Sequence, residues 1–227
     1  MREFRRRLIT VSVFILIATL LSFIFAQQLV DLLARPIGGI QELESIDVTE
    51  NISVFMKVSL MGGLVISMPV IVYQLIAFIV PGLTPSEKRG LFISLPAATI
   101  LFLSGVAFAY FIMLPRAVPF LLNFLNIPTA PRPKSYFSFV TRLVFWIGVS
   151  FELPLIMGVL ARLGAVSPQF LAKNSRYAVV IIAILAALIT PTPDPLNMGL
   201  VLAPLIVLYG VGILLAKVMY RPREPVT

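Results

Sequence analysis

Only one acidic side chain lies well inside a long apolar stretch of this chain. Glu152 stands in the middle of WIGVSFELPLIMGVL, residues 146–160. Inserting an acid at the centre of a membrane helix costs about 2.5–3.5 kcal/mol, and such acids are functional by default. Three roles are open: a structural hydrogen bond, a step in a proton or ion path, or a polar contact for another membrane helix. Gln74, beside Tyr73, is the best internal candidate for a partner.

The composition excludes several kinds of chemistry. The sequence has no Cys and no His, which removes disulfides, cysteine nucleophiles, histidine-based triads and HExxH zinc sites. It contains no GxxxxGK[ST] phosphate-binding loop. No second acid accompanies Glu152 inside an apolar run, which weakens both a proton relay and an intramembrane enzyme. We therefore expect no enzymatic activity, no cofactor and no metal site.

Hydropathy places the chain in a membrane. Of 227 residues, 59% are hydrophobic and only 12% are charged, whereas soluble domains average about 25% charged residues. Uncharged runs of about 20 residues, enough to cross the hydrocarbon core as helices, recur along the chain. Alternating strands of the membrane-barrel type are absent, so helices remain as the spanning element. The sequence predicts an all-α polytopic membrane protein with one domain.

Six transmembrane helices are predicted, followed by a short cytoplasmic tail over residues 217–227. The predicted spans are residues 8–26, 58–80, 90–114, 143–160, 177–189 and 196–216. The fifth has 13 residues and would extend only about 20 Å, so we expect local thinning of the bilayer or burial of its ends. Prolines, each of which removes a helical hydrogen bond and favours a kink, lie inside four spans: Pro69, Pro96, Pro154 and Pro204.

The basic N-terminus followed by an apolar run also fits a secretory signal peptide. The uncharged run is 19 residues long, longer than a typical signal-peptide core, and cleavage after Ala26 would place Ile24 where a small residue is needed. We expect an uncleaved first helix.

Lys and Arg residues predict the orientation. With the N-terminus inside, 12 of them lie on the cytoplasmic side and 6 on the outer side, so both termini should be cytoplasmic. The outer six are Arg35, Lys57, Arg116, Arg132, Lys134 and Arg142. The first outer loop is also acidic. Because the basic residues are spread over separate loops, the net charge of +8 does not indicate nucleic-acid binding.

Five stretches, in order, resemble the TatC family, the signal-peptide receptor subunit of the twin-arginine protein translocase. The stretch at residues 70–91, VIVYQLIAFIVPGLTPSEKRGL, resembles the second helix and first cytoplasmic loop. MREFRRRL resembles the N-terminal motif, and LFLSGVAFAYF resembles the third helix. SYFSFVTRLVFWIGVSFELPL resembles the fourth helix with its Phe-Glu-x-Pro signature. TPTPDPLNMGLVLAPLIVLYGVGI resembles the last outer turn and the sixth helix.

The resemblance implies a receptor in the prokaryotic cytoplasmic membrane that binds twin-arginine signal peptides. With single-span TatA and TatB partners, and as an oligomer, it would export folded proteins using the proton motive force. Kinked helices would form a concave surface. The residues that match the family's signal-peptide site are Glu3, Arg5, Arg7, Phe78 and Glu87. Carboxylates are natural bidentate partners for the two guanidinium groups of such a peptide.

The resemblance also implies roles within and outside the membrane. Glu152 matches the family's mid-membrane glutamate, which faces a lipid-open pocket and meets a polar residue of TatA or of the inserting peptide. Pro36 matches an outer-loop region linked to assembly, and Asp194 matches the acidic residue of the last outer turn. Two departures stand out. The N-terminal motif lacks its usual His, and Gly210 stands where many relatives carry Glu, which fits a single TatA-like partner.

A proton-coupled secondary transporter or channel is the main alternative. Such folds often contain inverted repeats around a mid-membrane site, and no convincing internal repeat is present here. A structural membrane scaffold is a third possibility, but it would have no need of Glu152.

Overall fold

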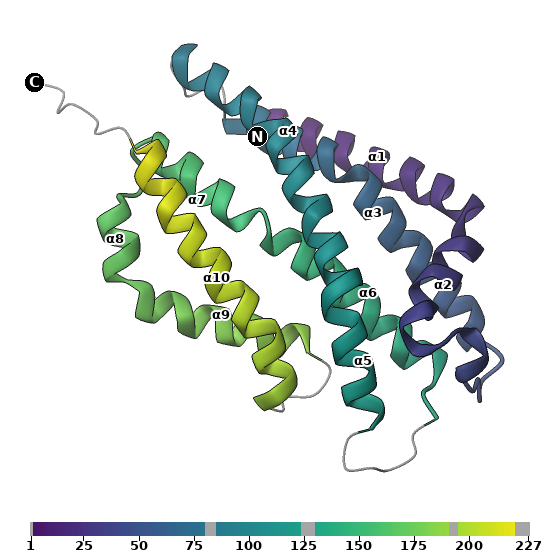
Figure 1. Ribbon diagram of the computed structural model, residues 1–227. Coiled ribbons are helices and arrows are strands. Elements are labelled where there is room, and N and C mark those ends of the chain that lie inside the picture. The colour runs from purple at the N-terminus through teal and green to yellow at the C-terminus, as the bar shows by residue number, and fades with distance from the viewer. Residues whose placement is uncertain (1, 80–84, 124–129, 191–194, 221–227) are drawn as a thin grey trace, which may run out of the picture.

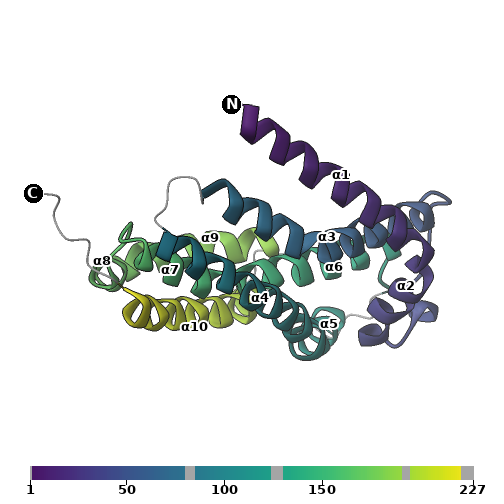
Figure 2. The same cartoon turned by 90° about the horizontal axis from the view of Figure 1, so that it is seen from above.

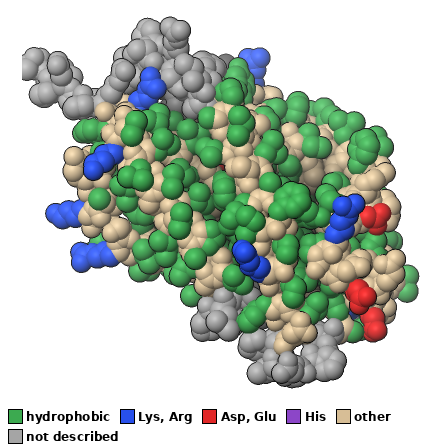
Figure 3. Space-filling view, viewed as in Figure 1, with side chains coloured by type: hydrophobic (Ala, Val, Ile, Leu, Met, Phe, Trp, Pro, Cys, Tyr) green, Lys and Arg blue, Asp and Glu red, His purple; other side chains and the backbone are tan. Residues whose placement is uncertain are grey.

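The computed structural model describes residues 2–79, 85–123, 130–190 and 195–220, with side chains for residues 3–78, 95–123, 130–190 and 198–220. Within these ranges every regular element is a helix, which confirms the predicted all-α fold class (Figure 1). Hydrophobic side chains cover most of the face seen in Figure 3, as expected for a surface in contact with lipid.

The chain begins with α1 (Arg2–Ile24), α2 (Ala26–Ala34), the short 3-10 turns η1 (Arg35–Ile37) and η2 (Ile40–Glu42), and the long helix α3 (Glu50–Ile79). It continues through α4 (Pro85–Phe108), the π-helical turn η4 (Ala109–Met113), α5 (Leu114–Leu122) and α6 (Pro133–Ser150). The C-terminal part contains α7 (Leu153–Arg162), α8 (Pro168–Lys173), α9 (Ser175–Ile189) and α10 (Pro195–Met219).

Five helical segments in the described ranges are long and apolar enough to cross a bilayer: Glu3–Ile24, Glu50–Phe78, Leu95–Leu122, Pro133–Arg162 and Met198–Met219. The sixth, Ser175–Ile189, has only 15 residues and so extends about 22 Å. This short helix supports the expectation of a thinned bilayer or buried ends beside it.

Several helices extend beyond the predicted spans. The predicted span 58–80 corresponds to α3, which begins at Glu50 and is described to Ile79, so the helix includes Lys57 although that charge ends the apolar run. The third span continues through η4 and α5 to Leu122. A hydropathy pattern detects the hydrocarbon-facing part of a helix, whereas the helix itself continues into the headgroup region, where charged residues are tolerated.

The fourth predicted span is two helices rather than one. α6 ends at Ser150, two turn residues follow, and α7 begins at Leu153. Pro154 lies at the start of α7, where its missing N–H and its ring are tolerated, whereas an uninterrupted helix would place the ring against the carbonyl of Ser150. The other three prolines lie inside the continuous helices α3, α4 and α10.

Helix α6 is the centre of the packing. It contacts α3, α4, η4 and α9, and it lies beside α3 in both views (Figures 1 and 2). Phe137, Val140 and Ile147 of α6 are fully buried in the main cluster, together with Leu114 of α5. In lipid the gain comes from close van der Waals contact rather than from removal of water. α7 instead packs mainly on α10.

Small residues set the crossing of α4 and α6. A Cβ atom added to Gly105 would lie 2.9 Å from the Cα atom of Gly148, closer than real atoms approach. The two backbones therefore touch at these glycines, because small residues let membrane helices approach closely. The ring of Phe151, at the end of α6, also lies against Gly105.

Polar contacts hold the region around α2 and the start of α3. Tyr136 and Tyr110 donate their hydroxyl groups to the carbonyls of Leu33 and Leu32, at 2.8 and 2.9 Å. Nη2 of Arg132 lies 2.5 Å from Oε1 of the buried Glu50 carboxylate. These contacts join α2 to η4 and α6, and the start of α3 to the residue that precedes α6.

Candidate functional site

The first polar cluster lies where the N-terminal turns of α1 meet the C-terminal turns of α3. The rings of Phe4 and Phe78 pack edge to face, with centroids 5.9 Å apart. One turn further along α1, Arg7 donates from Nη1 to the amide oxygen of Gln74 at 3.2 Å. Two antiparallel helices thus place an aromatic pair and a polar pair next to each other. Three of the predicted residues, Arg7, Gln74 and Phe78, share this place.

Glu3 belongs to the same cluster. Its Oε1 accepts from Nη2 of Arg7 at 2.7 Å and from Nε at 3.3 Å, in an i,i+4 pair. The Glu3 side chain is 57% exposed, so the pair is worth only about 0–1 kcal/mol. Oε2 of Glu3 accepts no hydrogen bond from the described residues. A carboxylate accepts several hydrogen bonds, so Glu3 keeps capacity for a further donor.

A hollow of about 580 Å³ lies beside this carboxylate. It is lined by Glu3, Arg6, Arg7, Thr10, Tyr73 and Gln74. One acid and two arginines line the hollow, so the net charge of these side chains is positive. Binding of a cationic ligand there needs a second acid nearby. Arg5 is exposed on the same helical turn and forms no ion pair with the described residues.

Other predicted residues fall at the limits of the described structure. Glu87 lies in the first turn of α4, but its side chain is outside the described residues, and Asp194 lies wholly outside them. Pro36 is half-buried in η1, directly before a turn in which Gly38 and Gly39 have φ values of +105° and +121°. Such φ values favour glycine, so Pro36 lies next to a sharp turn of the chain.

Glu152 occupies the break between α6 and α7. Its backbone N–H bonds Val149 and its carbonyl accepts from Ile156, so the main chain is satisfied across the break. Its side chain is 5% exposed, and Oε1 has no hydrogen-bond partner among the described residues. It stands at the N-cap of α7 without bonding the N–H groups of the first turn. A buried polar atom without a partner is costly, which indicates a role other than stability.

One expectation about Glu152 needs correction. The predicted internal partner, Gln74, uses its amide oxygen for Arg7 and makes no hydrogen bond to Glu152. Gln74 lies near the end of α3 that packs on α1. Glu152 itself is buried, and the lipid-open position that the resemblance implies for it stays a prediction.

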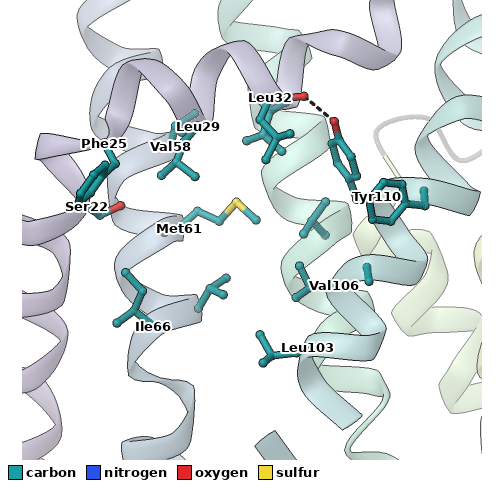
Figure 4. A pocket seen from close by; sticks show the side chains of 16 residues that line it. Ser22, Phe25, Leu29, Leu32, Val58, Met61, Ile66, Leu103, Val106 and Tyr110 are labelled. Atoms are coloured by element: carbon teal, nitrogen blue, oxygen red, sulfur yellow. Dashed lines mark hydrogen bonds between the residues drawn. The ribbon is translucent and has the colours of Figure 1, made fainter. Parts of the chain in front are cut away.

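A second cavity, of about 430 Å³, has a different character. It lies between the α1–α3 side of the molecule and the α4–η4 segment (Figure 4). Its polar side chains are Ser22, whose Oγ has no partner among the described residues, and Tyr110, which bonds Leu32. No charged residue lines it, so this cavity does not fit the arginines of a peptide.

Sequence reasoning missed the role of Glu50. The sequence placed it among the acids of the first outer loop, yet the structure buries it at 2% exposure beside Arg132. The two residues are 82 positions apart, and nothing in either local sequence indicates the contact. Removing one partner of such a pair leaves a buried charge and is strongly destabilising.

The fold and these polar positions define a multi-pass helical membrane protein. The model of the family described as "Sec-independent protein translocase protein (TatC)" matches residues 1–204. The chain belongs to the TatC family, a non-enzymatic family of protein translocase components.

Relatives and solved structures agree with the family match. The chain is 34% identical to the Sec-independent protein translocase protein TatC of Carboxydothermus hydrogenoformans, covering 98% of this chain and 93% of that protein. It is 37% identical to the TatC protein of Deinococcus radiodurans, covering 96% and 84%. The solved structure described as "Crystal Structure of Twin Arginine Translocase Receptor- TatC" superposes with a TM-score of 0.85 at 36% identity, covering 97% and 99%.

Proposed function

We propose that this chain is the receptor of a twin-arginine translocation system, which binds the signal peptides of folded proteins and nucleates their export driven by the proton motive force. Family membership and the likeness to a solved translocase receptor support the role. They favour protein export over a proton-coupled transporter or channel, the alternative that Glu152 leaves open.

The signal peptide binds where α1 and α3 meet. The observation that carries this proposal is the exposed Glu3 carboxylate, which has one unused oxygen beside the hollow next to Gln74. Glu87, in the first turn of α4, supplies the second acid. Each carboxylate takes one guanidinium group of the twin-arginine pair. Phe4 and Phe78 present an exposed aromatic edge for the apolar part of the peptide.

The arginines of the cluster set the selectivity. Arg7 holds Glu3 from one side, so the guest approaches the free oxygen from the other. Arg5 and Arg6 repel cations that arrive at the wrong register. A lysine pair would lose the planar, bidentate contact, because an ammonium group is a point charge with a tighter hydration shell.

The receptor lies in the prokaryotic cytoplasmic membrane with both termini in the cytoplasm. The twofold excess of Lys and Arg on the N-terminal side supports this orientation. It places the Glu3 cluster at the inner surface, where a newly made protein presents its signal peptide. The turn with Pro36 and the loop with Asp194 are then on the outer side, where copies of the chain assemble.

Glu152 is the docking point for a second helix inside the membrane. A carboxyl group with an unpartnered oxygen at a helix break can exchange hydrogen bonds with a polar residue of a TatA- or TatB-type single-span protein or of the inserted signal peptide. Gly210 on α10 leaves open space where a side chain would project. One TatA-like partner is sufficient for such an arrangement.

Site-specific crosslinking tests the peptide site. A photoreactive group placed at residue 4, 74 or 88 should capture a peptide with two arginines, and a peptide with two lysines should give far less product. The same group at residue 116, on α5, is the matched control. Equal capture of both peptides at residues 4, 74 and 88 would refute the proposed site.

A further inference from the structure

A polar groove on the face between α3 and α6 has no role in the proposed function. Lys57 of α3 and Arg142 of α6 both line it, together with Ser138 and Thr141, and its volume is about 280 Å³. The two helices lie side by side in Figures 1 and 2. Both cations belong to segments that are long and apolar enough to span a bilayer.

Neither cation has a counter-charge. Within the part of the chain that the structure describes, ion pairs involve Arg7 and Arg132 but not Lys57 or Arg142. Lys57 donates one hydrogen bond, to Ser138 Oγ at 2.5 Å, and has two N–H groups left. The Arg142 guanidinium makes no hydrogen bond to the described residues, so its five N–H groups are free.

Their depth identifies the environment. Lys57 lies seven residues after the start of α3 and Arg142 nine after the start of α6, about 10 and 14 Å along the helix axes. A bilayer is about 40–45 Å thick with a core of about 30 Å. With the starts of α3 and α6 placed at the bilayer surface, both Cα atoms lie in the outermost part of the hydrocarbon core, within reach of the headgroup layer. Long basic side chains extend from there toward the phosphates.

The rest of the groove is apolar. Leu64 and Phe145 line it one to two turns deeper along the two helices, on the side away from the helix starts. A ligand that fits has an anionic group at the headgroup level and a hydrocarbon chain below it.

We propose that this groove binds an anionic phospholipid, with its phosphate between Lys57 and Arg142 and one acyl chain over Leu64 and Phe145. Under the orientation proposed above, the lipid comes from the outer leaflet. The bound lipid neutralises two cations that the protein leaves unpaired and joins α3 to α6, the two central helices.

Lipid titration of the purified full-length chain, followed by native mass spectrometry, tests the proposal. Phosphatidylglycerol should bind about 25-fold more tightly than phosphatidylcholine with the same acyl chains, because each basic side chain near the phosphate contributes about fivefold. Lys57→Gln and Arg142→Gln should each weaken phosphatidylglycerol binding about fivefold, and the double variant about 25-fold. Arg142→Lys, which keeps the charge, should retain most of the affinity.

The control is Arg116→Gln, because Arg116 is an exposed arginine of α5 that does not line the groove. It should leave lipid binding unchanged. Equal affinity for the two lipids, or full phosphatidylglycerol affinity in the double variant, would overturn the proposal. Displacement of the lipid by inorganic phosphate alone would also overturn it, because it would indicate a site for free anions. Lipid selectivity that appears only after a partner protein is removed would overturn it too, because it would show that Lys57 and Arg142 pair with a carboxylate of that partner. The comparison of lipids on the unmodified chain decides the question even if a variant fails to fold.

Discussion

Two glutamates of this chain have spare hydrogen-bonding capacity in opposite environments. Glu3 is 57% exposed at the end of a helix and holds Arg7 with one oxygen. Glu152 is 5% exposed at a break between helices and holds nothing with Oε1. In water an unused oxygen has little cost, because solvent satisfies it. In the membrane the same oxygen is destabilising until a partner arrives.

The difference explains why the two residues suit different guests. A cation can reach Glu3 from water and lose part of its hydration in exchange for a charge-assisted bond. A cation cannot reach Glu152 without crossing hydrocarbon, so the partner that we propose there is a polar side chain already carried by a helix. Under the proposed function, the first site selects charge and the second selects hydrogen-bonding groups at one depth.

The largest expected effect is on peptide binding at the exposed site. Glu3→Gln should weaken the affinity for a twin-arginine peptide about 10–150-fold, because a hydrogen bond to a charged group contributes about 1.5–3 kcal/mol. Glu87→Gln should have an effect of the same size. Fluorescence anisotropy with a labelled peptide measures both. Glu42→Gln, an exposed acid of η2, is the control and should bind normally. Normal peptide binding by Glu3→Gln would show that the exposed Glu3 carboxylate does not bind the peptide.

Replacing the buried acid should have the opposite effect on stability. Glu152→Met should raise the free energy of unfolding by about 1–3 kcal/mol, because it removes a buried oxygen that has no partner. Export of a twin-arginine cargo should nevertheless fail, while peptide affinity changes less than about twofold. Denaturant unfolding in detergent and an export assay check the two halves. Loss of stability would mean that Glu152 is a structural residue.

The packing that holds the Glu152 break can be tested separately. Gly148→Leu should lower the free energy of unfolding by about 1–3 kcal/mol, because a Cβ there would lie 2.8 Å from the ring of Phe102. Gly210→Leu makes the same change where a Cβ meets nothing within 4 Å, and it should not destabilise. Thermal unfolding of both variants gives the contrast. Equal stability of the two would show that α4 does not constrain α6 at this point.

The smallest effect is expected for the surface ion pair. Arg7→Gln should change the free energy of unfolding by only about 0.3–0.5 kcal/mol, and the difference should shrink at high salt. Arg6→Gln, which removes an arginine without an ion-pair partner in the described residues, is the matched control. An effect above about 1 kcal/mol would mean that the Glu3 cluster is built for stability rather than for a guest.

The sequence predicted the fold class well, because hydropathy is read one helix at a time. Long uncharged runs must be helical in lipid, and the helices lie where those runs lie. The sequence was less accurate for helix ends. The predicted span begins at residue 58, whereas α3 already begins at Glu50. The cluster of Glu3, Arg7, Gln74 and Phe78 was partly predictable, because the sequence marks these residues on two segments. It does not show that the two segments meet. The Glu50–Arg132 pair was not, since a contact across 82 residues leaves no trace in either segment.

By itself, the sequence determined that this protein is a helical membrane protein with few acids. It singled out Glu152 by type and position, and Glu3 and Glu87 through the resemblance to a family motif. Only the tertiary structure decided what each polar group meets. It gave Gln74 to Arg7 rather than to Glu152, buried Glu50, and left Lys57 and Arg142 without an ion-pair partner among the described residues. The physical reason is that hydropathy is a sum over neighbours in the chain, whereas hydrogen bonds and ion pairs depend on which helices pack together.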